Sequence, residues 1–169
     1  MTAKLCLYKS AILSYLTYCS LVWHFCRKKL ERVNERGLRT VSCNWRTTYE
    51  NLLARGKLTT LYNRRLQNIT IFMYKVKNNL LPINVINLFQ EGTAKSSYNL
   101  RNADFLIPRF LTTTYGKHSL RYFGPYLWSK LPSNVRKKPS LESFKISVRK
   151  MNVENLVDNN CEGCILCNS

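Results

Sequence analysis

The most constraining feature of this sequence is a row of apolar residues between positions 62 and 80, separated by alternating steps of four and three. Its members are Tyr62, Leu66, Ile69, Met73, Val76 and Leu80. Such steps place side chains on one face of an α-helix, which turns once in about 3.6 residues. Pro82 follows the pattern and predicts its end. The row is shorter than about three heptads, so we expect a core helix of a bundle and not a coiled coil.

Two upstream segments show the same helical spacing. The first covers residues 5–25 and the second residues 27–43, where Glu35 and Arg39 also stand at the spacing of a favourable ion pair. The residues expected to face inward are Leu5, Tyr8, Ile12, Leu16, Cys19 and Trp23 in the first segment, and Leu30, Val33, Gly37, Leu38 and Val41 in the second. A glycine inside a helix costs about 1 kcal/mol relative to alanine. We therefore expect another helix to approach closely at Gly37.

The first of these segments leaves two interpretations open. Residues 10–26 carry no formal charge and are followed by Arg27, Lys28 and Lys29, a pattern that is also found at the end of a membrane-spanning helix. We favour a buried core helix, because Lys9 and several serine, threonine and tyrosine hydroxyl groups interrupt the apolar run.

Shorter elements are predicted further along the chain. Residues 49–55 form a short helix that ends at Gly56, and residues 82–89 form another. In the C-terminal half, the pair Gly116-Lys117 predicts the turn of a β-hairpin, and Pro125 predicts the start of a short helix. That helix carries Leu127, Trp128 and Leu131 inward. Ser140 is expected to cap a last helix with an apolar stripe of Leu141, Phe144, Val148 and Met151.

The predicted fold class is mainly α, a helical bundle of about five to seven helices with a small β-hairpin element in the C-terminal half. We expect a helical bundle at residues 1–89 and a polar linker at residues 90–99. The hairpin and short helices then occupy residues 100–151, and a polar, Cys-rich tail occupies residues 152–169.

The segment TTTYGKHSLRYFGPYLWSKLP, followed by a Ser-led helix with Phe144-Lys145, carries a family resemblance. It resembles the region downstream of the polymerase in LINE-type (non-long-terminal-repeat, jockey-like) retrotransposon reverse transcriptases. The matching residues are Thr113, Tyr115, Gly116, Ser119, Pro125, Leu127, Trp128, Leu131, Pro132, Phe144 and Lys145. The segment AILSYLTYCSLVW resembles the family's helix after the polymerase palm, so the resemblance covers residues 8–150. It implies a thumb-like segment that helps to grip template RNA or an RNA–DNA hybrid, here without the catalytic palm.

Charge points independently to an acidic partner. The chain has 27 Lys and Arg residues against nine Asp and Glu, a net charge of +18. Tyrosine and tryptophan residues stand among these cations, an arrangement typical of proteins that hold phosphates while bases stack on aromatic rings. The expected partners are RNA, single-stranded DNA or an RNA–DNA hybrid. The expected contacts are Arg109, Lys117, Arg121, Arg136, Lys137 and Lys138, of which the last three are predicted to form an exposed loop.

Catalytic chemistry is not expected. Two-metal polymerases and nucleases need clustered carboxylates, whereas the only aspartates here are Asp104 and Asp158, far apart in sequence. Cys19 and His24 lie five residues apart, which does not place them on one helix face, so buried, inert thiols are favoured over a nucleophilic pair. We therefore predict a protein that is not an enzyme.

The C-terminal tail contains Cys161, Cys164 and Cys167, spaced as C-x2-C-x2-C. Two cysteines at this spacing are a zinc half-site, which would need a fourth ligand from elsewhere, such as His118, Cys43 or a partner chain. A free thiol-rich tail is the favoured interpretation, and no cofactor is predicted.

These observations predict a non-catalytic nucleic-acid-binding fragment derived from a retrotransposon reverse transcriptase. Two alternatives stay open: a protein–protein interaction domain of a domesticated or decaying transposon remnant, and a basic membrane-anchored protein. The odd number of cysteines, seven, and the lack of a signal-peptide cleavage pattern predict an intracellular protein, nuclear or cytoplasmic and not secreted.

Overall fold

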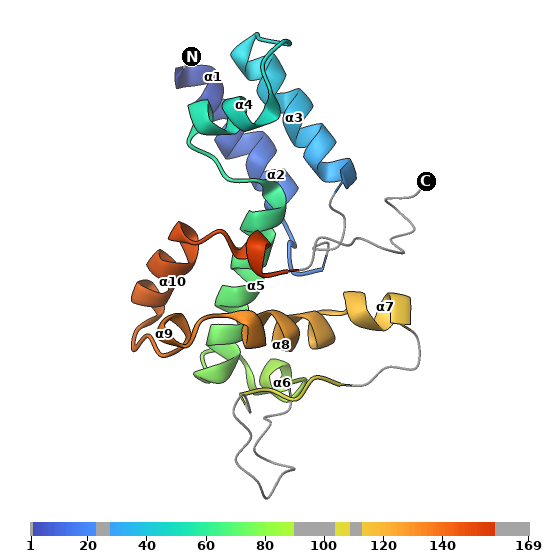
Figure 1. The fold of residues 1–169 in the computed structure, drawn as a ribbon, viewed down its shortest axis with the longest axis vertical. Helices are drawn as coiled ribbons and strands as arrows, with labels where there is room; N and C mark the ends of the chain where they lie inside the picture. The colour runs from blue at the N-terminus through green and yellow to red at the C-terminus, as the bar shows by residue number, and fades with distance from the viewer. Residues whose placement is uncertain (1, 23–27, 90–103, 109–112, 158–169) are drawn as a thin grey trace, which may run out of the picture. The chain divides into compact units, whose positions relative to one another are not determined.

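The computed structural model describes residues 2–22, 28–89, 104–108 and 113–157 (Figure 1). The regular elements among these residues are helices, and no strand occurs in this part of the chain. The predicted mainly α fold class is confirmed. The described residues divide between Arg65 and Leu66 into two compact units, here called the N-terminal and the C-terminal unit. This division lies inside a helix and differs from the predicted one at residues 90–99, which lie outside the described residues.

The N-terminal unit begins with a helix that contains a π-helical turn. Its elements are α1 (Thr2–Leu7), the π turn η1 (Tyr8–Ile12), α2 (Leu13–Thr17), α3 (Lys28–Ser42), α4 (Tyr49–Gly56) and the start of α5 (Leu61–Lys77). A π turn holds one residue more than an α turn, so the inward position after Tyr8 moves from Ile12 to Leu13. Ile12 is 44% exposed and Leu13 only 5%. The helix ends at Thr17 and not at Phe25 as predicted, and Cys19, expected to face inward, is exposed with a φ of 48°.

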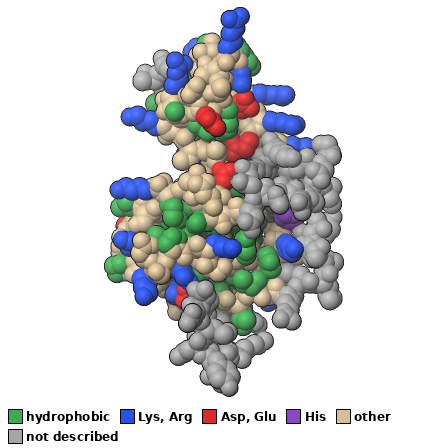
Figure 2. Space-filling view, in the orientation of Figure 1, with side chains coloured by type: hydrophobic (Ala, Val, Ile, Leu, Met, Phe, Trp, Pro, Cys, Tyr) green, Lys and Arg blue, Asp and Glu red, His purple; other side chains and the backbone are tan. Residues whose placement is uncertain are grey.

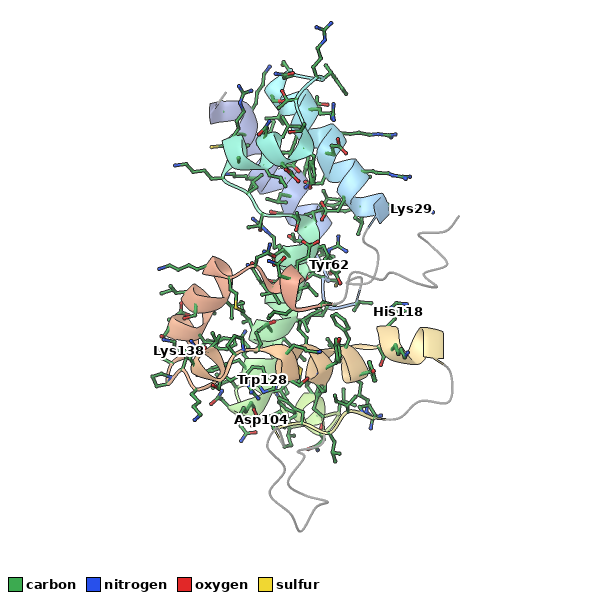
Figure 3. The ribbon with its side chains drawn as sticks, viewed as in Figure 1. Lys29, Tyr62, Asp104, His118, Trp128 and Lys138 are labelled. Carbon is green, nitrogen blue, oxygen red and sulfur yellow. The ribbon has the colours of Figure 1, made fainter. Side chains whose placement is uncertain are left out.

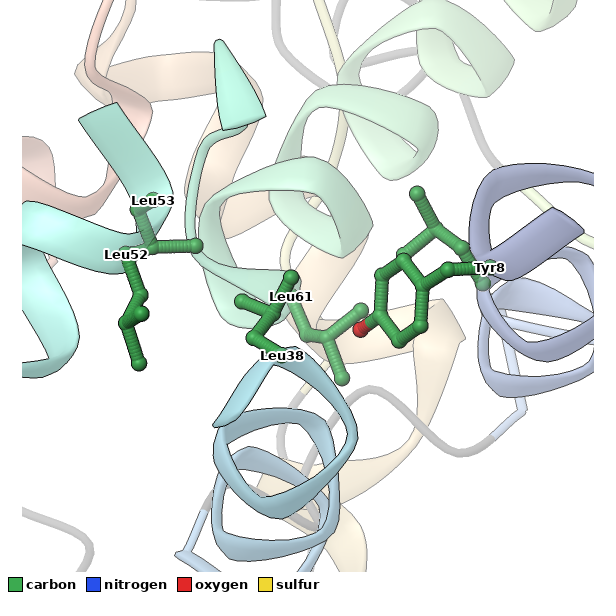
Figure 4. Close-up of a cluster of buried hydrophobic side chains, with 6 residues drawn as sticks. Tyr8, Leu38, Leu52, Leu53 and Leu61 are labelled. Carbon is green, nitrogen blue, oxygen red and sulfur yellow. The ribbon is translucent and has the colours of Figure 1, made fainter. Parts of the chain in front are cut away.

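The apolar core of the N-terminal unit is small and made mostly of leucines (Figure 4). Its buried members are Tyr8, Leu13, Leu38, Leu52, Leu53 and Leu61. A Cβ atom added at Gly37 would lie 2.9 Å from a ring carbon of Tyr8, which confirms the predicted close approach. The predicted inward position of Val33 is wrong. Val33 is 49% exposed, and the neighbouring polar Asn34 takes the buried place instead.

A chain of polar side chains crosses this core. The Tyr8 hydroxyl donates to the Asn34 side-chain oxygen, and the Asn34 amide donates to the Tyr49 hydroxyl at 2.6 Å. Tyr49 in turn donates to the Glu31 carboxylate, which also accepts the backbone N–H of Tyr62 at 2.7 Å in the first turn of α5. Burial, followed by the charge of Glu31, raises the pKa of Tyr8 to about 12, and burial with the Glu31 hydrogen bond also raises the pKa of Tyr49. The chain joins α3 and α4 to the turn η1 and to the start of α5.

The C-terminal unit is built around the rest of α5. Its other elements are α6 (Ile83–Ile86), α7 (Thr113–His118), α8 (Leu120–Lys130), α9 (Ser133–Arg136), α10 (Leu141–Lys150) and the 3₁₀ turn η3 (Val153–Leu156). The sequence predicted the inward face of α5 well, because Leu66, Ile69, Met73 and Val76 are at most 3% exposed. Leu80 is an exception, at 55% exposed. The helix ends before it, at Lys77, and Asn79 adopts a φ of 54°.

The predicted β-hairpin turn at Gly116-Lys117 is wrong. Both residues belong to helix α7. Ser119 explains the difference: its hydroxyl donates to the Gly116 carbonyl at 2.8 Å and accepts the backbone N–H of Tyr122 at 3.3 Å. One serine therefore closes α7 and caps the start of α8, so the chain continues as a helix and not as a returning strand.

The same cap corrects the predicted start of the next helix. We placed the start at Pro125, but α8 begins at Leu120 and contains Pro125 in its interior. Proline lacks the N–H that would bond to the carbonyl four residues earlier, and the helix continues through it. The predicted inward residues Leu127, Trp128 and Leu131 are confirmed, at 0%, 1% and 2% exposed.

The core of the C-terminal unit is aromatic. Tyr74 stacks on Phe144 with ring centroids 4.2 Å apart. The centroid of the Trp128 ring lies 5.9 Å from the ring centroids of both Phe144 and Phe105. Ser140 caps α10 as predicted, and Phe144 and Val148 are fully buried. Gly124 permits close packing of α8 on α5, because a Cβ there would lie 2.6 Å from the Met73 sulfur.

Candidate nucleic-acid interface

The predicted contact residues fall into different environments. Lys117 in α7, Arg121 in α8 and Lys137 after α9 are exposed, and Lys138 is half-buried. Arg109 lies outside the described residues. Figure 2 shows Lys and Arg side chains spread over the visible face, with fewer Asp and Glu. The structure therefore presents three of the six predicted contacts as exposed cations.

Arg136 does not fit the predicted exposed loop. It is the last residue of α9, its side chain is only 16% exposed, and one of its guanidinium nitrogens lies 3.5 Å from the Asp104 carboxylate. Of the predicted run of three exposed cations, only Lys137 is exposed, because Arg136 and Lys138 are half-buried. The Lys138 backbone carbonyl accepts a hydrogen bond from the Tyr74 hydroxyl at 2.9 Å, which ties this turn to α5.

Asp104 gathers several donors in the C-terminal unit. Its carboxylate lies 2.7 Å from the Lys77 ammonium and accepts the Trp128 indole N–H at 2.9 Å, and Figure 3 labels Asp104 and Trp128 close to each other. Burial acts to raise the pKa of Asp104, but the hydrogen bonds from Lys77 and Trp128 and the charges of Lys77 and Arg136 outweigh it and lower the pKa below its ordinary value. Asp104 is therefore ionised at neutral pH and holds two cations inside the unit.

A second group of residues, which lies on α8, was not predicted from the sequence. Tyr122, Tyr126 and Lys130 follow one another at steps of four on the helix, and Arg121 precedes them. The Tyr122 and Tyr126 rings are 6.3 Å apart and nearly parallel, at 10°. The Lys130 ammonium lies 5.5 Å from the centre of the Tyr126 ring. The steps of four indicate this row once Ser119 is recognised as the helix cap, whereas a helix that starts at Pro125 leaves Tyr122 outside it.

The α7–α8 segment carries a net positive charge. Residues 113–130 include Lys117, Arg121 and Lys130 and no Asp or Glu. Burial lowers the pKa of His118 below its ordinary value of 6.5, so His118 is mainly neutral at pH 7 and adds little to the positive charge. The segment itself carries no carboxylate, and Asp104, which contacts it at Trp128, is paired with Lys77 and Arg136, so cations and tyrosine rings dominate what an approaching anion meets.

The described carboxylates do not group as ligands for a metal ion. Glu142 on α10 pairs with Lys145 at 2.6 Å, and Asp104 is held by the partners described above. Within residues 2–22, 28–89, 104–108 and 113–157, no three or more His, Cys, Asp and Glu side chains group as metal ligands. His24, Cys161, Cys164 and Cys167 lie outside these ranges.

Of the segment that left a membrane-spanning interpretation open, residues 10–17 are helical, in η1 and α2, and the helix ends at Thr17. In the part of the chain that the structure describes, no helix has both the length and the apolar character needed to cross a bilayer. No protein-family model matches the chain, and neither does any curated protein or solved structure. The resemblance to LINE-type reverse transcriptases therefore stays a prediction.

Proposed function

We propose that this chain is a non-catalytic nucleic-acid-binding protein that holds RNA, single-stranded DNA or an RNA–DNA hybrid by its phosphates. The observation that carries the proposal is the pairing pattern in the C-terminal unit. Its described aspartate, Asp104, holds Lys77 and Arg136, whereas Lys117, Arg121 and Lys137 extend from α7, α8 and the end of α9 as exposed cations. With a net charge of +18, such a surface favours a polyanion.

The resemblance of residues 8–150 to the region after the polymerase in LINE-type reverse transcriptases supports the same partner. In that family the segment acts beside a polymerase palm that binds the catalytic metals. We infer that this chain contributes grip on the template and no nucleotide transfer.

The salt dependence of binding tests this function. Each phosphate that the protein neutralises on a single strand releases counterions. A plot of the logarithm of the binding constant against the logarithm of the salt concentration therefore has a slope of about −0.7 for each contact. Changing Lys117, Arg121, Lys137 and Lys138 together to Gln should weaken binding to labelled RNAs of different sequence by similar factors. It should also make the salt slope shallower by about 3 if all four residues contact phosphates.

A matched control removes four exposed cations of the N-terminal unit: Lys9, Arg32, Arg55 and Lys57. This variant has the same net charge as the first, and its salt slope should stay close to that of the unchanged chain. Equal loss in both variants would mean that charge alone attracts the RNA, without a site in the C-terminal unit. Binding that does not respond to salt would contradict the proposal altogether.

One observation favours a second function, that of a protein-interaction domain. The α1–α2 helix and the residues after it expose large apolar side chains: Leu7 is 69% exposed, Tyr15 82%, Tyr18 75% and Val22 60%. Contiguous exposed apolar patches are typical of surfaces that bind other proteins, and we infer that these side chains, close together in sequence, contribute to one. Sedimentation velocity tests it, because self-association that grows with concentration and is lost in a Tyr15→Ser, Tyr18→Ser variant would support this function.

A further inference from the structure

We propose that Tyr122 and Tyr126 on α8 form a stacking platform for two unpaired bases, with Arg121 and Lys130 positioned for the adjoining phosphates. This inference rests on the proposed function and deepens it, because it assigns a site and a preference for single strands over duplexes. Electrostatic attraction to phosphates supplies no such preference by itself.

The helix geometry separates this row from the core. The buried residues of α8 are Gly124, Pro125, Leu127 and Trp128, whereas Tyr122, Tyr126 and Lys130 repeat at steps of four on another face. Both tyrosines are half-buried and Lys130 is exposed. A half-buried ring keeps one part packed and fixed while another part stays accessible, as a rigid platform for a ligand requires.

The rings are prearranged for stacking. Tyr122 and Tyr126 are tilted by only 10° from each other with centroids 6.3 Å apart, and Phe123 lies 6.2 Å from Tyr126 and braces it. Bases stack on aromatic side chains irrespective of sequence, since every base has a flat aromatic face. Bases inside a duplex already stack on their neighbours and cannot reach such rings, so the platform discriminates by strandedness.

The charges around the rings match the same ligand. The Lys130 ammonium lies over the Tyr126 ring, 5.5 Å from its centre, so a base that stacks on this face would displace it toward the adjoining phosphate, and Arg121 directly precedes Tyr122. Lys117 adds a third cation, and residues 113–130 hold no carboxylate. An anionic chain that bears flat bases complements these groups, whereas an uncharged apolar partner would leave the cations without counterions.

The test compares three double variants of Tyr122 and Tyr126, in which both are changed to Leu, to Ala or to Phe. Binding is measured by fluorescence anisotropy with three labelled probes: a 15-nucleotide oligouridylate, a 15-base-pair RNA duplex, and a 15-unit strand that carries abasic sugars. The Leu variant keeps apolar packing without rings, and the Phe variant keeps the rings. Thermal midpoints from circular dichroism show whether each variant is folded.

We expect the Leu and Ala variants to lose tenfold or more in affinity for oligouridylate and less than twofold for the duplex and the abasic strand. The Phe variant should bind all three probes as the unchanged chain does. The salt slope should stay the same in all of them, because no cation is removed. If the Ala variant does not fold, the Leu and Phe variants still decide the question.

Two results separate failure of the platform from failure of the proposed function. If the unchanged chain binds none of the probes, the proposed function is wrong and the platform with it. If it binds them and the folded Leu variant loses affinity equally for all three probes, or for none, nucleic-acid binding stands and the platform is overturned.

Discussion

The cores of the two units are built on different principles. In the N-terminal unit, hydrogen bonds from Tyr8 to Asn34 and Tyr49 and on to Glu31 cross a small set of leucines. In the C-terminal unit, stacked aromatic rings fill the interior, and the ionic group of Asp104 is half-buried. A polar core fails when one partner is removed, whereas an aromatic core fails when volume is removed. The two units should therefore respond to different substitutions.

The largest effect is expected from Trp128→Ala in the C-terminal unit. Removing a fully buried tryptophan costs about 3–5 kcal/mol through lost burial and the cavity left behind. It also takes the indole N–H away from Asp104. Urea unfolding followed by circular dichroism at 222 nm measures the loss. Trp45→Ala is the control, because Trp45 is 63% exposed, and a comparable loss there would contradict the assignment of the core.

Asn34→Leu should be the most damaging polar substitution in the N-terminal unit. It leaves the buried hydroxyl of Tyr8 without its acceptor and that of Tyr49 without a donor, at a cost of about 1–3 kcal/mol. Adding Tyr8→Phe should recover part of the loss, since both groups are then apolar. The exposed Asn51→Leu is the control. No recovery in the double variant would mean that packing, and not hydrogen bonding, dominates here.

Alkaline pH should destabilise the N-terminal unit first. The pKa of Tyr8 is raised from 10.0 to about 12 in the folded chain, so the folded state holds this proton more tightly than the unfolded state does. The contribution of protonated Tyr8 to the free energy of unfolding is complete below about pH 10 and is lost as the pH rises towards about 12. Urea midpoints measured across this range should fall, and Tyr8→Phe should make the fall less steep.

Acid should instead act on the C-terminal unit through Asp104. Its pKa lies below 3.8 when folded, so the unfolded chain takes up the proton first as the pH falls. The contribution of Asp104 is therefore present above about pH 4 and disappears as the pH falls through the folded-state pKa. Asp104→Asn should remove this part of the acid sensitivity, as fluorescence of the buried Trp128 can report. An unchanged acid profile in that variant would contradict the role of Asp104.

The smallest effect is expected for the ion pair on α3. Glu35 and Arg39 lie 2.6 Å apart, at the predicted spacing, with side chains 32% and 23% exposed. Pairs of this kind contribute about 0.3–0.5 kcal/mol. Glu35→Gln should lower the unfolding free energy by that amount and lose its effect in 1 M salt. A loss above about 1 kcal/mol would show that Glu35 has a structural role beyond the pair.

The sequence was a good guide to residues whose place depends on local periodicity. Leu66, Ile69 and Met73 on α5 and Phe144 and Val148 on α10 are buried as their spacing indicated. Gly37 was understood correctly from its cost inside a helix, because the ring of Tyr8 occupies the space of a Cβ.

Residues whose place depends on partners distant in sequence were missed. Nothing local to Arg136 shows that it pairs with Asp104, 32 residues earlier, and an exposed loop was the natural prediction for a basic run. Asn34 was not among the residues expected to face inward, because its partners Tyr8 and Tyr49 lie 26 and 15 residues away in the sequence. Ser119 could have been recognised locally, because serine is a preferred helix-capping residue. The glycine and proline residues around it were instead interpreted as a hairpin turn and a later helix start.

Because of the π turn at Tyr8–Ile12, the first helix should tolerate the deletion of one residue within this turn. Such a turn is an α-helix with one residue inserted. Deleting a single residue, Ser10 or Ala11, would return the segment to regular helical spacing, with the residues now numbered Tyr8 and Leu13 four apart and still on one face. A one-residue deletion elsewhere in a packed helix rotates every later side chain by about 100°. At this position, the structure offers evolution and protein engineering a deletion that leaves the inward face intact.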